Sequence, residues 1–116
     1  LKDTAIPFEY NNIESFKKKI KKYDGQIGTI IMEPVRSVKP KKGFLEYIQK
    51  AAKKMGAVFI IDEITSGFRE NLGGIHLKYN IKPDIAVLSK AMSNGYPCSA
   101  IIGKKNVMEV AQRNFY

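Results

Sequence analysis

The hydrophobic positions of this chain fall into short continuous runs that alternate with amphipathic segments. Three runs rich in β-branched residues, at residues 27–32, 57–61 and 85–88, are predicted to be strands. Continuous apolar runs are typical of parallel strands that are buried on both faces. The segment between the second and third runs is long enough for a crossover connection, so we expect these two strands to be parallel neighbours.

Further segments place apolar residues at helical spacing and are predicted to be helices. Asn12 can cap the first of them, and Gly56 follows the second in the position favoured just beyond a helix end. In the first helix, Phe16 and Ile20 are expected to face inward because they are spaced by one helical turn. The predicted helix limits are residues 13–23, 44–55, 75–79 and 106–114.

A fourth apolar run, at residues 98–102, follows Lys90 too closely for a helical crossover. We therefore expect it to pair antiparallel or to lie at a sheet edge. The alternation of strands and helices predicts an α/β fold, a three-layer sandwich around a mostly parallel sheet with right-handed crossovers. Residues 1–116 are expected to be the middle of a larger sheet rather than a complete enzyme.

Two chemically active side chains follow the second and third apolar runs. Asp62 comes directly after residues 57–61, and Lys90 follows residues 85–88 after one serine. Ligands of open parallel sheets bind at the carboxyl ends of the strands, so we expect both side chains at the binding edge. A lysine there suits a Schiff-base nucleophile, because burial and nearby cations favour its neutral amine. A lysine that reaches into solvent and an aspartate that caps a loop are the alternatives on spacing alone.

Composition and charge limit the classes of partner. The chain has 116 residues, a formal net charge of +9, 44% hydrophobic and 27% charged residues, which suits one small domain with a modest core. The lysines within residues 17–22 surround Ile20, as on the wet side of an amphipathic helix. The basic residues 39–42 lack interleaved aromatic residues that could stack on bases. We therefore expect no nucleic-acid partner, while binding of an acidic partner stays open.

The sequence also indicates a location. No apolar run approaches the length of a membrane span, and the first residues include neither an initiator Met nor a signal-type apolar region. We expect no membrane partner and a soluble, cytoplasmic chain that is a fragment of a longer protein. The single cysteine, Cys98, cannot form an internal disulfide and lacks the partners of a metal site, which suits a reducing compartment. We predict that Cys98 is buried and inert, and that the chain has no metal site.

Four motifs follow one another along the sequence from residue 33 onward. They are Glu33-Pro34-Val35, residues 62–69, Pro83-Asp84 and residues 89–97. In order and spacing they resemble the class-III pyridoxal-phosphate-dependent aminotransferases, and above all the glutamate-1-semialdehyde aminomutase-like branch. The resemblance runs from about Gly28 to the C-terminus. It implies that residues 1–116 are part of a fold-type I large, cofactor-binding domain.

The resemblance implies roles for individual side chains. Lys90 matches the lysine that holds pyridoxal 5'-phosphate as a Schiff base and moves the proton between the substrate and the cofactor. Asp62 matches the carboxylate that binds the pyridine nitrogen and keeps it protonated, so that the ring withdraws electrons. Ile64 matches the aliphatic side chain against the ring face. Thr65 occupies a position near the phenolic oxygen of the ring, and Glu33 falls on an active-site glutamate whose role here stays open.

The function implied is the transfer of an amino group from a small-molecule amino donor to a carbonyl acceptor, in a full-length homodimer. Two alternatives stay open. The first is a glutamate-1-semialdehyde 2,1-aminomutase, although residues 93–97 depart from the glycine run more typical of those enzymes. The second is a non-catalytic basic α/β module that binds an anionic partner. In relatives, the phosphate-binding turn and the aromatic residue that stacks on the ring lie upstream of these residues.

Overall fold

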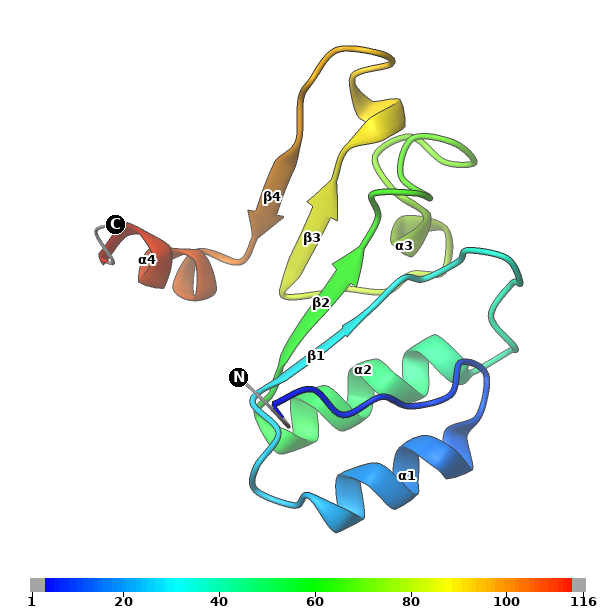
Figure 1. Cartoon of the computed structure of the whole chain (residues 1–116), viewed down its shortest axis with the longest axis vertical. Helices are drawn as coiled ribbons and strands as arrows, with labels where there is room; N and C mark the ends of the chain where they lie inside the picture. The colour runs from blue at the N-terminus through cyan, green and yellow to red at the C-terminus, as the bar shows by residue number, and fades with distance from the viewer. Residues whose placement is uncertain (1–3, 114–116) are drawn as a thin grey trace.

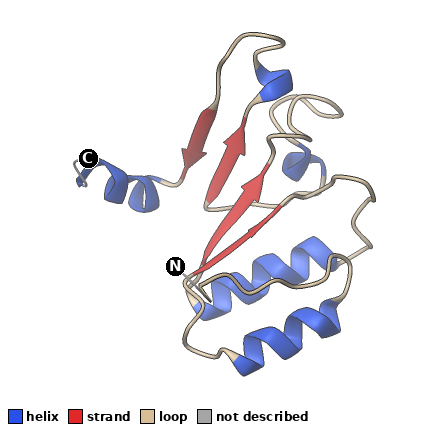
Figure 2. Cartoon of the chain, viewed as in Figure 1, coloured by secondary structure: helices blue, strands red, loops and turns tan. Residues whose placement is uncertain are grey.

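The computed structural model describes residues 4–113, except for the side chains of residues 111 and 112, and shows a small α/β unit (Figure 1). Its strands form one sheet in the order β1-β2-β3-β4, with β1, β2 and β3 parallel and β4 antiparallel (Figure 2). The predicted mostly parallel sheet and the antiparallel fourth strand are therefore confirmed. The elements are α1 Ile13–Lys22, β1 Thr29–Met32, α2 Phe44–Met55, β2 Val58–Asp62, α3 Ile75–Lys78, β3 Ile85–Leu88, the 3-10 helix η1 Lys90–Met92, β4 Ala100–Gly103 and α4 Lys105–Arg113.

The ends of the two long helices follow from local chemistry. The backbone N–H of Ser15 donates to Oδ1 of Asn12 at 2.9 Å, so Asn12 caps α1 as predicted. Gly56 ends α2 with φ of 70°, a left-handed conformation that glycine adopts without steric cost. The limits of α2 agree with the prediction, whereas α1 ends one residue earlier, because Tyr23 forms its C-terminal cap.

The hydrophobic core lies between the sheet and the two long helices (Figure 1). Side chains alternate along a strand, so Phe59 and Ile61 of β2 both face α2 and are buried. Phe16 is also buried, while most lysines of α1 are exposed, which confirms the amphipathic reading of that helix. Within residues 4–113 no helix is both long and apolar enough to cross a bilayer.

The opposite face of the sheet is only partly covered within the described residues. Ile31 of β1 is 57% exposed and Ile101 of β4 is 61% exposed. The three-layer sandwich was predicted for the larger sheet of which residues 1–116 are the middle, and residues 4–113 place both α2 and α3 on one face of that sheet. The reason is geometric. Along the chain, β2 pairs beside β1 and β3 pairs on the far side of β2, so both right-handed crossovers place their helices, α2 and α3, on the same face of the sheet.

Asp84 fastens the amino-terminal end of β3 to both neighbouring strands. Its backbone N–H donates to the carbonyl of Phe59, and its Oδ2 accepts from the N–H of Phe59, both at 2.8 Å. Its Oδ1 accepts from Nζ of Lys104 at 2.7 Å, and its carbonyl accepts from the N–H of Lys104 at 2.9 Å. Burial raises the pKa of Asp84, but the hydrogen bonds from Lys104 and Phe59 outweigh it and hold the pKa below its ordinary value.

Asp84→Asn in the full-length protein is expected to reduce the loss of stability in acid. The folded-state pKa of Asp84 is lowered, so its stabilisation is present above the unfolded pKa of about 4 and disappears as the pH falls through the lower folded pKa. Thermal melts between pH 7 and pH 3 should show a lower melting temperature for the variant at pH 7 and a smaller further decrease below pH 4. Glu109→Gln, which removes the exposed pair with Lys105, is the matched control and should follow the wild type. Equal acid sensitivity of Asp84→Asn and wild type would contradict this assignment.

Residues 1–116 expressed alone are expected to self-associate, because the exposed face of the sheet is apolar. Replacing Ile31 and Ile101 together with serine should reduce the association measured by light scattering. Val38→Ser is the control, since Val38 is about as exposed but lies in the loop after β1. A monodisperse monomer that binds pyridoxal phosphate stoichiometrically through Lys90 would show instead that this part of the chain is self-sufficient.

Candidate active site

The predicted site residues gather at the carboxyl edge of the three parallel strands. Asp62 is the last residue of β2 and pairs in register with Val87 of β3. Glu33 directly follows β1, and Lys90 begins η1 two residues after the end of β3. Because all three strands point the same way, one edge of the sheet carries two carboxylates and an amine.

Asp62 is half-buried and lies on the face of the sheet away from α2. This follows from alternation, because its neighbour Ile61 is fully buried on the helical side. The Oδ1 atom of Asp62 accepts from the backbone N–H of Ile64 at 2.9 Å, which fixes the direction of the carboxylate. An ionised carboxylate has about four acceptor positions, so the group can accept from a further donor at this edge.

Lys90 and Thr65 are brought into contact by the structure. The Nζ of Lys90 donates to Oγ1 of Thr65 at 3.0 Å, across a gap of 25 residues in the sequence. Lys90 has φ of 49°, in the left-handed region that is uncommon for a residue with a side chain. Its side chain is exposed in the described part of the chain, because η1 begins beyond the last ladder residue of β3. The chain itself therefore does not bury this amine.

The remaining predicted residues occupy less constrained positions. Ile64 is half-buried in the loop after β2. Oε1 of Glu33 accepts from a guanidinium nitrogen of Arg36 at 3.3 Å, and its buried Oε2 has no hydrogen-bond partner among residues 4–113. Cys98 is exposed, so the expectation of a buried thiol is wrong. The reason is that residue 98 precedes β4, in the loop that extends beyond the sheet edge (Figure 1).

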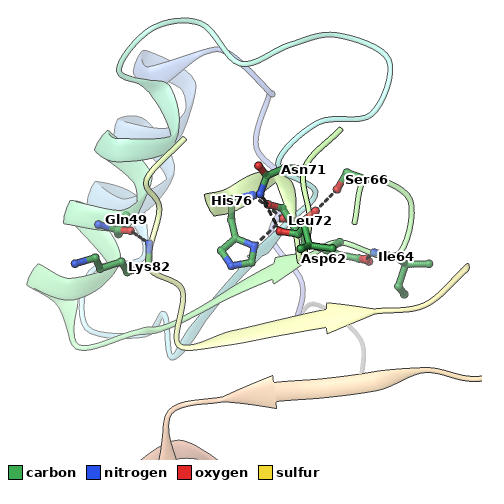
Figure 3. Close-up of polar contacts among 10 residues, drawn as sticks. Gln49, Asp62, Ile64, Ser66, Asn71, Leu72, His76 and Lys82 are labelled. Atoms are coloured by element: carbon green, nitrogen blue, oxygen red, sulfur yellow. Dashed lines mark hydrogen bonds and ion pairs between the residues drawn. The ribbon is translucent and has the colours of Figure 1, made fainter. Parts of the chain in front are cut away.

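A buried polar cluster beside Asp62 was not found by sequence reasoning. Glu63 is 0% exposed, and its Oε1 accepts from the backbone N–H of His76 at 2.7 Å. Nδ1 of His76 lies 2.8 Å from the same oxygen, and the hydroxyl of Ser66 donates to Oε2 (Figure 3). Nδ1 of His76 is therefore within hydrogen-bond distance of the same oxygen that accepts from its backbone N–H. The available signal was the Asp62-Glu63 pair itself, because alternation in a strand turns the second carboxylate toward the core side.

The loop that closes this cluster is tightly packed. A Cβ atom on Gly74 would lie 2.7 Å from Nδ1 of His76 and 3.0 Å from Oε1 of Glu63. A Cβ atom on Gly67 would lie 2.8 Å from the carbonyl oxygen of Glu63. Nδ2 of Asn71 also donates to the carbonyl of Gly74 at 3.0 Å. Burial of an unpaired carboxylate costs several kcal/mol, and loss of one donor here would cost about 1–3 kcal/mol.

Comparison with known sequences gives a consistent result. A family model described as aminotransferase class-III matches residues 3–114. The glutamate-1-semialdehyde 2,1-aminomutase of Hyperthermus butylicus is 38% identical over 105 residues, which are 87% of this chain and 25% of that protein. The protein of the same name from Thermosipho africanus is 41% identical over 105 residues, again 87% of this chain and 25% of the relative. The chain thus spans about a quarter of the length of these curated relatives.

Solved structures give the same result for the fold. The PLP internal aldimine form of the FumI protein from Sphingopyxis sp. MTA144 matches with a TM-score of 0.88 at 26% identity, covering 96% of this chain and 28% of that one. The ornithine δ-aminotransferase of Plasmodium falciparum matches with a TM-score of 0.81 at 29% identity, covering 90% of this chain and 28% of that one. The four-stranded unit therefore has the arrangement of a segment of much longer chains.

Proposed function

Because this chain belongs to the class-III aminotransferase family, we propose that the full-length protein is a pyridoxal 5'-phosphate-dependent enzyme that moves an amino group between an amino compound and a carbonyl acceptor. The observation that carries the proposal is the placement of Asp62 and Lys90 at one edge of the sheet, at the ends of adjacent parallel strands. Residues 1–116 are proposed to be part of its large, cofactor-binding domain. The family match favours an enzyme over a non-catalytic basic module that binds an anionic partner.

The side chains at this edge fit the reactive groups of the cofactor. Asp62 offers a carboxylate for the protonated pyridine nitrogen, and Lys90 offers a primary amine for the aldehyde carbon. Ile64 offers an aliphatic surface for the ring, and the hydroxyl of Thr65 can donate to the phenolic oxygen. When bound, pyridoxal phosphate supplies the electron sink that stabilises the negative charge left by cleavage of a substrate C–H bond.

The chain's own residues divide the chemistry between them. Asp62 would place its carboxylate beside the pyridine nitrogen and would keep that nitrogen protonated. Lys90 would hold the cofactor through its primary amine, and the free amine would carry the proton from the substrate α-carbon to the cofactor. Thr65 limits the positions that the Lys90 amine can take, through the hydrogen bond of 3.0 Å. Each role is a part of the proposal.

A second candidate function is intramolecular amino transfer. It is favoured by the curated relatives at 38% and 41% identity, which are named glutamate-1-semialdehyde 2,1-aminomutases. Against it, residues 93–97 read Ser-Asn-Gly-Tyr-Pro and contain a single glycine. Glutamate 1-semialdehyde supplied alone distinguishes the two functions, because only an aminomutase converts it without a separate donor and acceptor.

We propose further that the full-length protein is a homodimer in the cytoplasm. The dimer is supported by Tyr96, which is 82% exposed in the loop next to the site. The location is supported by the single exposed Cys98, since a free surface thiol suits a reducing compartment. Substrates are proposed to be a small-molecule amino donor and a carbonyl acceptor.

Borohydride reduction of the full-length holoenzyme, followed by peptide mapping, is expected to place a pyridoxyl label on Lys90. Lys90→Ala should lose the label and the turnover while it keeps the fold, because the exposed amine packs against little of this chain. Lys82→Ala removes another exposed lysine, just before β3, and should remain fully active as the control. A label on any other lysine would show that the assignment of Lys90 is wrong.

Asp62→Asn is expected to keep the packing of β2 and to lose rate, because the charge beside the pyridine nitrogen disappears while the side-chain volume is unchanged. The loss should be roughly 3–4 kcal/mol of transition-state stabilisation, by comparison with other preorganised electrostatic groups. Steady-state kinetics at saturating cofactor measure it. Asp24→Asn, an exposed position after α1, is the control. Unchanged turnover in Asp62→Asn would remove this residue from the mechanism.

A further inference from the structure

The carboxylate of Glu63 is fully buried, but no step of the proposed reaction uses it. It directly follows Asp62 in the sequence and extends the β2–β3 ladder, since its N–H donates to the carbonyl of Val87 at 2.9 Å. The two neighbouring carboxylates lie on opposite faces of the sheet. A fully buried carboxyl group with three hydrogen-bond partners is costly to assemble, so its position beside the candidate site needs an explanation.

Glu63 joins the two ends of the crossover loop between β2 and α3. One end is held through the hydroxyl of Ser66, and the other through the backbone N–H and Nδ1 of His76, 13 residues further along the chain (Figure 3). Gly67 and Gly74 let the backbone approach so closely that a side chain at either position would collide with this cluster. The loop is therefore fastened at both ends to one carboxylate.

The first residues of the fastened loop are the ones that contact the candidate site. The N–H of Ile64 orients the carboxylate of Asp62 at 2.9 Å, and Oγ1 of Thr65 accepts from Nζ of Lys90 at 3.0 Å. Both residues lie between Glu63 and Ser66, so a shift of the loop moves the two contacts together. We propose that Glu63 and His76 are positioning residues, which hold this loop so that Asp62 and Thr65 present a fixed geometry to the cofactor and to Lys90. This inference rests on the proposed function.

An exposed ion pair in the same region provides a comparison. Nζ of Lys78 lies 3.0 Å from Oε2 of Glu70, with both side chains largely exposed to solvent. Exposed pairs are screened by water and salt and contribute little, whereas a buried carboxylate fixes its donors because no water can replace them. The two pairs thus connect the loop to α3 in different environments, and only the buried one is expected to control geometry.

The test uses variants of the full-length holoenzyme that change one donor at a time. His76→Leu removes the ring donor and keeps the backbone donor, while His76→Asn places an amide N–H near the position of Nδ1. Small displacements of catalytic groups cost on the order of ten- to a hundredfold, so His76→Leu is expected to lower kcat by this factor, with KM changed less than about twofold. The visible absorption bands of the bound cofactor should also differ from those of the wild type in His76→Leu. His76→Asn should restore both the kcat and the absorption bands.

An independent readout comes from the protein without cofactor. Amide hydrogen exchange at Ile64 and Thr65 should be faster in His76→Leu than in wild type and should return toward the wild-type rate in His76→Asn. Glu70→Gln is the matched control and should leave exchange, absorption and kcat unchanged. If His76→Leu does not fold, hydrogen exchange, absorption and kcat of Ser66→Ala test the positioning role instead, since this substitution removes one donor to Glu63 at almost constant side-chain volume.

The outcomes separate this inference from the proposed function. A lower melting temperature with wild-type kcat, absorption and exchange in the folded variant would overturn the positioning role and leave only a structural one. Absence of a pyridoxyl label on Lys90 in the wild-type holoenzyme would overturn the proposed function itself. A labelled wild type whose His76 and Ser66 variants match it in every readout would overturn the positioning role alone.

Discussion

The parallel pairing of β2 with β3 is the constraint on which the candidate site depends. It aligns Asp62 with Val87, so that both strands end at one edge and release their loops side by side. Asp84 secures the amino ends of this pair, through Phe59 on one side and Lys104 on the other. The buried carboxylate of Glu63 secures the carboxyl ends, and the candidate site residues Asp62, Thr65 and Lys90 lie at or just beyond these ends.

Local signals allowed much of this fold to be predicted from the sequence. The limits of α2 were predicted because the spacing of its apolar residues and the glycine after its last residue are both local signals. The strand β4 was expected to pair antiparallel or to lie at a sheet edge, because the connection before it is short. The face of the sheet that carries both α2 and α3 could not be predicted in the same way, because it depends on the direction in which both crossovers turn. The contact between Glu63 and His76 spans 13 residues and needs the folded loop. The roles of Asp62 and Lys90 came from the resemblance to a family, since their spacing alone also suited ordinary loop residues.

Because side chains alternate along a strand, two adjacent residues that both carry a carboxyl group lie in different environments. Asp62 lies half-buried at the open edge, whereas Glu63 lies among donors in the core side of the same strand. A shift of β2 by one residue would exchange these environments and would leave a charge among apolar side chains. The register of the strand is therefore specified by polar groups as well as by Phe59 and Ile61.

The backbone of Lys90 has a further consequence for how this protein can evolve. A left-handed conformation costs roughly 1 kcal/mol or more in a residue with a side chain, and glycine would avoid that cost. Here the turn is held by the N–H groups of Ser93 and Asn94, which both donate to the carbonyl of Lys90. Replacing Lys90 with glycine would relieve the strain of this turn and stabilise the chain, but it would also remove the side-chain amine. Under the proposed function, selection for activity and selection for stability thus act in opposite directions at this one position.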